Sequence, residues 1–324
     1  MKAFSSLNSA KNLMQTMREL SLDDLRAAAE KPPRLLVMAP THDAADRIVF
    51  NVTGEFRSPY VTGTTLDTPV DRLDAYDAVV IYDPDALPAT RVLIEQLGKR
   101  DQNVVIATFL STDPDDVTAA HGVRTRIVNR LPDRAMALGR HLPAFVPVAI
   151  KSVIDDTSVA NAQFALLANV PSVVPILGTL ATVSADVLVL TKNQLLLVYK
   201  VAAIHGRNLE DKSAILREMA PVAGAGFFWR TIAREATTIL PMAAGTVPKV
   251  AIAYSGTVAI GRAADYYYRF GEKPGKELLE SYYRMGFESL KRREFLFRKS
   301  KTVDADFRVY DDRLENGNSN GTAT

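Results

Sequence analysis

The chain has 324 residues, of which 47% are hydrophobic and 23% are charged, and its formal net charge is +2. This length is enough for two domains that each bury a core, and the small net charge favours no particular class of partner. The absence of cysteine excludes disulfides, thiolate metal ligands and cysteine nucleophiles, and the four histidines are too far apart in sequence to indicate a metal site.

Residues 1–33 predict one or two amphipathic helices. Leu13, Met17 and Leu20 recur at helical spacing, and Ser21 is placed to cap a second helix that ends before Pro32. We interpret these helices as docking onto the domain that follows. The segment lacks the apolar run of a secretory signal, so we expect this part of the chain to lie in the cytosol.

Residues 34–132 alternate short apolar runs with helical patterns, which is typical of a mainly parallel sheet covered on both faces. The predicted strands are residues 35–38, 60–64, 78–82, 104–108 and 125–128. The predicted helices are residues 43–52, 87–97 and 114–120. We therefore expect an α/β domain built on a small doubly wound, Rossmann-like sheet.

The segment after the first strand lies where a nucleotide-binding domain places its phosphate loop, but the diagnostic residues are missing. In the register of Gly, four residues, Gly-Lys and Ser or Thr, the chain carries Ala39, Ala44, Ala45 and Asp46. Without glycines the backbone cannot wrap a phosphate, without lysine nothing neutralises it, and the aspartate repels it. The sequence thus predicts no catalytic, cofactor-binding or metal site, and it does not indicate an enzyme.

Two later loops extend the resemblance to a GTPase. Asp83 ends a strand as a Walker B aspartate does, and Ala86 stands where a GTPase carries its γ-phosphate-sensing glycine. Asp113 takes the last position of a guanine-reading Asn-Lys-x-Asp motif, whose first two members are replaced by Leu110 and Ser111. Over about residues 34–130 the chain therefore resembles a small GTPase that has lost its nucleotide site. An unrelated Rossmann-like domain is the alternative.

Residues 133–300 have a helical and strongly apolar pattern. Residues 157–185 contain no charge, and residues 236–261 contain only Lys249. The predicted helices are residues 134–142, 145–153, 186–204, 212–219, 227–240, 249–270 and 276–297. We expect residues 301–324 to form a flexible tail, because they are too polar to fold alone.

Two groups of mostly small and apolar residues in this half form a recognisable pattern. They are Pro175-Ile176-Leu177-Gly178, Asp186, Leu190, Gln194 and Ile204-His205-Gly206, and then Ser255-Gly256-Thr257-Val258-Ala259-Ile260-Gly261-Arg262-Ala263-Ala264. Over about residues 150–270 the chain is therefore similar to the YcjF-like bacterial family of unknown function, whose domain often follows Era-type GTPase domains. The resemblance implies membrane association beside a GTPase-like module, with no assigned activity.

The charge-free stretches are long enough to enter a bilayer, and equally suit the core of a helical bundle. Gly256 and Gly261 favour close packing of helices in lipid. The basic residues between the two stretches oppose two simple crossings and favour a re-entrant hairpin that turns at residues 171–178. The basic helix at residues 284–301 favours peripheral attachment to an anionic surface, or is a solvated face of a packed helix.

We therefore expect a non-catalytic, membrane-associated scaffold or regulatory protein of the bacterial cytoplasmic membrane, with both terminal regions in the cytosol. The expected partners are the lipid bilayer, other membrane or GTPase-system proteins and a second copy of the chain, with no specific nucleic acid. The alternatives are a cytoplasmic, soluble helical protein with an apolar ligand cavity, and an active GTPase with an atypical phosphate loop.

Overall fold

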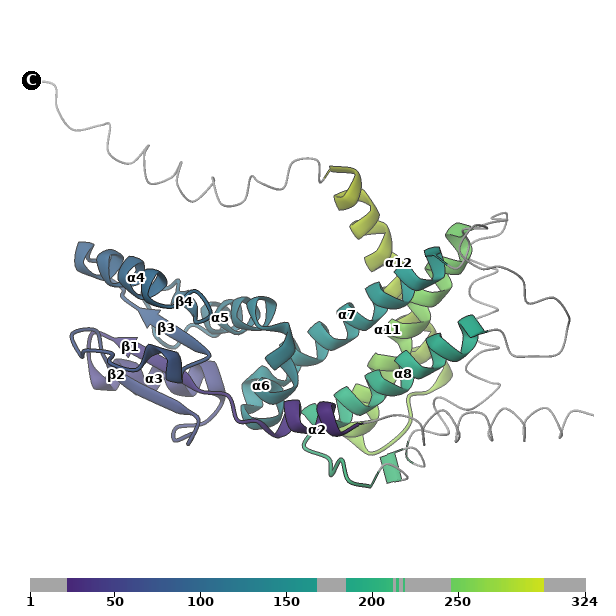
Figure 1. The fold of residues 1–324 in the computed structure, drawn as a ribbon, viewed down its shortest axis with the longest axis horizontal. Helices are drawn as coiled ribbons and strands as arrows, with labels where there is room; N and C mark the ends of the chain where they lie inside the picture. The colour runs from purple at the N-terminus through teal and green to yellow at the C-terminus, as the bar shows by residue number, and fades with distance from the viewer. Residues whose placement is uncertain (1–21, 168–184, 212–213, 216–217, 219–245, 300–324) are drawn as a thin grey trace, which may run out of the picture.

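The computed structural model describes residues 22–167, 185–211, 214–215, 218 and 246–299. Within these residues the chain has two parts that lie side by side (Figure 1). One part is a parallel sheet with its covering helices, and the other is a set of long helices. The α/β part and the additional helices are those expected from the sequence.

The sheet has four parallel strands in the order β2-β1-β3-β4. The strands are β1 (Leu35–Ala39), β2 (Val61–Thr65), β3 (Ala78–Tyr82) and β4 (Val105–Phe109). All residues of β1 and β3 are buried, because both faces of these central strands are covered. This explains why they appear in the sequence as continuous apolar runs.

Helices cover the two faces unequally. One face carries α3 (His42–Thr53) and α5 (Val117–Arg130), which also contact each other. The other face carries α4 (Pro88–Arg100) and the segment between β2 and β3, which contains only the short turn η1 (Leu73–Ala75). The crossover from β2 to β3 therefore lacks the helix that usually accompanies such a connection.

The fifth predicted strand, residues 125–128, is wrong, because these residues lie inside α5. The β-branched residues Val123, Ile127 and Val128 suggested a strand, but they recur at the spacing of one helical face, and all three are buried against the sheet and the neighbouring helices. Packing of the apolar face thus outweighs the local preference for strand.

Among the described residues, the helical part consists of α6 and four longer helices. Their bounds are α6 (Ala135–His141), α7 (Val146–Leu167), α8 (Ala185–Ile204), α11 (Thr246–Phe270) and α12 (Lys276–Lys299). Helix α11 packs against α7, α8 and α12. The predicted helices at residues 212–219 and 227–240, the turn at residues 171–178 and the tail at residues 301–324 lie wholly or mainly outside the described residues.

Small residues allow α11 to approach its neighbours closely. A Cβ placed on Gly261 would lie 2.5 Å from Cγ1 of Ile154 on α7. A Cβ placed on Gly286 of α12 would lie 2.8 Å from the Cα of Ser255. Gly261, one of the two glycines that suggested packing in lipid, therefore serves a contact between helices of this bundle.

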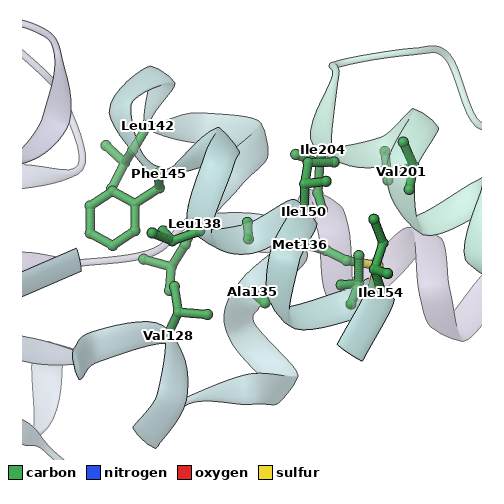
Figure 2. Packing of buried hydrophobic residues seen from close by; sticks show 14 of the residues in the cluster. Val128, Ala135, Met136, Leu138, Leu142, Phe145, Ile150, Ile154, Val201 and Ile204 are labelled. Carbon is green, nitrogen blue, oxygen red and sulfur yellow. The ribbon is translucent and has the colours of Figure 1, made fainter. Parts of the chain in front are cut away.

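The two parts share one hydrophobic core, and α6 lies at their junction (Figure 2). Val128 of α5 faces Leu138 of α6 there, and Ile150 of α7 lies close to Ile204 of α8. The short N-terminal helix α2 (Asp23–Glu30) packs mainly against α6 and α8, so it docks onto the helical part and not, as predicted, onto the α/β domain that directly follows it. The predicted cap residue, Ser21, lies outside the described residues.

None of the helices in the described part of the chain is sufficiently long and apolar to cross a bilayer. This finding contradicts the predicted location in the bacterial cytoplasmic membrane. The charge-free stretch at residues 157–185 lies only partly within the described residues, where its first part belongs to α7 and Ala185 to α8. In α7 the apolar residues are buried against α8 and α11, and the same helix carries Lys151 and Asp156 on its exposed side.

Candidate functional site

The carboxyl edge of the sheet is the place where a doubly wound domain binds its ligand. In such sheets a ligand enters the crevice where neighbouring connections leave in opposite directions. In the order β2-β1-β3-β4 this crevice lies between β1 and β3. The ends of β1, β3 and β4, the loops after them and the start of α3 therefore form the candidate site, and they carry the residues that the sequence placed in nucleotide motifs.

The loop after β1 forms a helix cap and no phosphate cradle. Thr41 is the cap of α3, and its Oγ1 accepts a hydrogen bond of 3.2 Å from the N–H of Ala44. Ala39 and Ala45 are completely buried, and the carbonyl oxygen of Ala39 already accepts the N–H of Leu66 at 2.9 Å. The N–H of Ala44, which lies in the register of the phosphate loop, is thus already bonded within the fold.

The loop after β3 is held by Asp83, the residue in the Walker B position. One carboxylate oxygen accepts the N–H of Leu87 at 2.8 Å, and the other accepts the N–H of Asp85 at 3.2 Å. These bonds hold Ala86 in the left-handed region, with φ of 49°. The carboxylate of Asp83 therefore stabilises the turn that follows it. Ala86, at the position of the γ-phosphate-sensing glycine, has a left-handed backbone of the kind that glycine usually adopts.

The loop after β4 is also closed by its own side chains. The carboxylate of Asp113 accepts the N–H of Asp115 at 2.9 Å, and Asp116 caps α5 by accepting the N–H groups of Thr118 and Ala119. The hydroxyl of Tyr82, at the end of β3, donates to the carbonyl oxygen of Thr112 at 2.7 Å. Asp113 is therefore a turn residue here and not a reader of a base.

An ion pair between Arg47 and Asp115 ties α3 to the loop after β4. Arg47 of α3 donates to both oxygens of Asp115, with Nε 3.3 Å from Oδ1, and Asn51 donates to the same oxygen at 3.0 Å. The hydrogen bond from Arg47 lowers the pKa of the Asp115 carboxyl below its ordinary value. Arg47 is thereby engaged, and the surrounding exposed aspartates disfavour a polyphosphate.

The same loops offer no arrangement for a metal ion. Within the part of the chain that the structure describes, no group of three or more His, Cys, Asp or Glu residues is placed to hold one. A hollow of about 380 Å³ lies instead between α4 and the segment that connects β2 to β3, and Leu66, Val70, Leu93 and Leu97 contribute to its lining. The apolar ligand cavity that the alternative reading placed among the helices stays a prediction.

Sequence reasoning missed a polar cluster in the helical part. His205, at the end of α8, has its Nε2 2.9 Å from Oδ1 of Asp265 on α11, and Nε of Arg269 lies 2.9 Å from the same oxygen. Burial alone would raise the pKa of Asp265, but the hydrogen bond from His205 and the charge of Arg269 hold it below its ordinary value. His205 and Asp265 are 60 residues apart, so no local pattern reveals this pairing.

A second polar layer joins α7, α8 and α11. Asn161 is fully buried, donates to Oγ1 of Thr257 at 2.8 Å and accepts from Nδ2 of Asn193 at 2.7 Å. The hydroxyls of Ser158 and Ser255 are buried nearby on the same helices and make no hydrogen bond with the described residues. This layer fixes the register of three helices whose contacts are otherwise apolar.

No family model matches the chain, and neither a curated protein nor a solved structure matches it. The resemblances to a GTPase and to the YcjF-like family therefore stay predictions. The structure does bring two segments of the second resemblance together, because His205 contacts Asp265 of α11, the helix that also contains Ser255–Ala264.

Proposed function

We propose that this chain is a non-catalytic scaffold or regulatory protein, in which a GTPase-like domain without a nucleotide site is fixed to a helical bundle. The main support for the proposal is that polar side chains at the carboxyl edge of the sheet are already hydrogen-bonded within the fold. Side-chain oxygens at this edge accept hydrogen bonds from nearby backbone N–H groups, and they belong to Thr41, Asp83 and Asp116. A site that binds and turns over a ligand keeps such groups available.

The electrostatics of the edge support the same conclusion. A triphosphate needs a lysine or arginine that faces it, or a magnesium ion held by a hydroxyl. Arg47 is bound to Asp115, and Asp46 stands where the magnesium-binding hydroxyl would be. Binding a nucleotide would therefore require breaking an ion pair and bringing phosphates next to several carboxylates.

The joint between the two parts supports a role in holding surfaces in a fixed relation. The core runs without interruption from the sheet through α6 into α7 and α8. Two domains connected by a flexible linker would not share buried side chains in this way. A continuous core transmits the position of the α/β domain to the helices, as a scaffold requires.

The proposal is tested by offering nucleotides to the full-length chain. GTP and ATP, each with magnesium, are added at about 1,000 times a 5 µM dissociation constant, and thermal unfolding is followed. A nucleotide bound that tightly would stabilise the fold by about 4 kcal/mol, so we expect no shift beyond that of a magnesium-only control. Calorimetric titration with GTP gives an independent measurement. Micromolar binding, or release of phosphate above background, would overturn the proposal.

A matched variant tests the physical reason. Asp115→Asn removes one carboxylate from the edge and weakens the hold on Arg47, so it is the change that most favours a polyphosphate. We expect this variant to bind GTP no more tightly than about 1 mM, because the backbone cradle is still absent. If Asp115→Asn bound GTP tightly and the native chain did not, the repulsion by the carboxylate, and not the missing glycine backbone, would be what prevents GTP binding.

A further inference from the structure

The two edges of the sheet differ in whether another strand can reach them. Strands β2 and β4 form these edges. On β4 the carbonyl oxygen of Thr108 points outward and accepts a hydrogen bond of 2.8 Å from Nη1 of Arg126. A guanidinium on the edge blocks the approach of a further strand, which is a common protection of edge strands.

The edge of β2 carries no such protection among the described residues. The N–H of Leu35 bonds to Tyr60, and the N–H of Leu66 bonds to Ala39, so the even-numbered residues of this stretch pair with β1. In a parallel pair the alternate residues direct their backbone groups away from the partner. Val61, Gly63 and Thr65 therefore point their N–H and C=O groups outward, and the sequence of β2 contains neither a charge nor a proline.

We propose that the β2 edge pairs with the β2 edge of a second copy of this chain, in antiparallel orientation and centred on Gly63. Two of the outward groups are already engaged: the N–H of Val61 bonds to Ser58, and the carbonyl of Thr65 accepts the N–H of Thr68. In an antiparallel pair centred on Gly63 these two groups would face each other.

The outward groups that remain form a self-complementary set. The N–H and C=O of Gly63 match the same groups of the second copy, and the N–H of Thr65 matches the C=O of Val61. Each hydrogen bond occurs twice by the twofold symmetry, so the surface is complementary to itself, as an isologous interface requires. The pairing joins two four-stranded sheets into one continuous sheet and leaves the protected β4 strands as its outer edges.

Two oppositely charged residues that flank β2 also favour the antiparallel pairing of the two copies. Arg57 precedes the strand and Asp67 follows it, and both are exposed. An antiparallel pair brings the start of each strand beside the end of the other, so Arg57 of one copy approaches Asp67 of the other at both ends of the interface. A parallel pairing, or an unrelated peptide, would not unite these two charges.

One charge opposes the association. Asp46 of α3 lies over Gly63, and a Cβ on Gly63 would be 3.6 Å from its Oδ1. The two copies of Asp46 therefore stand near the twofold axis and repel each other. This repulsion and the short strand give a weak dimer, with a dissociation constant of about 100 µM.

The first test measures sedimentation of the full-length chain over a concentration range that spans the expected constant. We expect a monomer–dimer equilibrium. Reversing one charge, in Asp67→Arg or Arg57→Asp, should raise the dissociation constant of the dimer about fivefold. The reason is that the twofold symmetry removes an exposed ion pair at both ends of the interface. Combining the two exchanges should restore association, and Asp46→Asn should strengthen it. Arg91→Glu, an exposed arginine on α4, is the matched control and should change nothing.

The second test identifies the register by disulfide formation, which is clean because the chain has no cysteine. In the proposed pairing Thr62 lies opposite Thr64 of the other copy in a non-hydrogen-bonded position, where the Cα atoms are close enough for a disulfide. A mixture of Thr62→Cys and Thr64→Cys chains should therefore cross-link faster than either variant alone. A chain that stays monomeric at all concentrations overturns the proposal, and so does a dimer that the charge exchanges or this mixture do not affect.

Discussion

Arg134 forms a two-pronged ion pair with Asp77 at the point where the sheet, the N-terminal segment and the helical part meet. Its Nε and Nη2 lie 3.2 and 3.1 Å from the two carboxylate oxygens, and its remaining N–H groups donate to the carbonyls of Lys31 and Pro32. Asp77 in turn accepts the N–H of Arg34 at 2.8 Å. The side chains of Arg134 and Asp77 are only 15% and 25% exposed, so water screens this pair little.

The first prediction concerns this pair. Arg134→Ala leaves the carboxylate of Asp77 with only the N–H of Arg34 as a donor, and it removes the donor to two backbone carbonyls in a poorly hydrated place. We expect the free energy of unfolding to fall by about 2–3 kcal/mol, measured by urea denaturation. Arg134→Lys should recover only part of the loss, because an ammonium cannot reproduce the fork of a guanidinium.

A second Arg–Asp ion pair, on the surface of the protein, provides a matched control for the junction pair. Arg72 and Asp74 form a similar two-pronged pair, at 3.1 and 3.2 Å, but their side chains are 78% and 62% exposed. Arg72→Ala should therefore leave the free energy of unfolding nearly unchanged. An equal effect of the two alanine variants would show that burial does not decide the value of the junction pair.

The second prediction concerns the buried amide of the bundle. Asn161→Ala removes a donor to Thr257 and an acceptor for Asn193, and it leaves a small cavity. We expect a loss of about 2 kcal/mol in the free energy of unfolding. Gln163→Ala, an exposed position on the same helix, is the control and should be close to neutral. Equal stability of the two variants would contradict a role for Asn161 in fixing the helices.

Much of the α/β part could be predicted from the sequence because its signals are local. Strand β3 is buried on both faces and therefore appears as an uninterrupted apolar run, which the structure confirms at residues 78–82. The same reasoning failed at Ile127 and Val128, where β-branched residues occupy the buried face of α5. A short apolar run does not distinguish the two structures by its residue types alone.

The helical part exposed a different limit of sequence reasoning. A stretch without charge looks the same whether lipid or protein surrounds it, and the apolar residues around Asn161 and Ser255 are surrounded by other helices of the chain. The polar contacts that give the bundle its register join residues far apart in sequence. Asn161 and Thr257 are separated by 96 positions, so only the fold could reveal their hydrogen bond.

The third prediction is a dependence of stability on pH through Asp265. Its carboxyl has a pKa below the ordinary value in the folded chain, because His205 and Arg269 favour the charged form more strongly than burial disfavours it. Such a group stabilises the fold at pH values above its unfolded pKa of about 3.9, and the contribution is lost as the pH falls through the lower folded value. The chain should therefore lose stability between neutral and acid pH.

The variant Asp265→Asn isolates this contribution. It should be less stable than the native chain at pH 7, and the difference between the two should shrink in acid, when the native carboxyl also becomes neutral. Urea denaturation at a series of pH values gives this difference directly. A difference that stays constant over the whole series would mean that Asp265 acts through its shape and not through its charge.

The last prediction concerns the turn after β3, where Ala86 has a φ of 49°. A left-handed backbone costs an alanine about 1 kcal/mol, and the two hydrogen bonds that Asp83 accepts hold it there. Ala86→Gly removes this strain but makes the unfolded chain more flexible, so we expect the stability to change by less than about 0.5 kcal/mol or to rise slightly. Ala160→Gly, at an exposed position inside α7, has no strain to relieve and should cost about 1 kcal/mol. Urea denaturation of both variants measures the contrast. Equal losses would show that Ala86 is not strained, and that the glycine expected at this position of a GTPase is missing without consequence for the backbone.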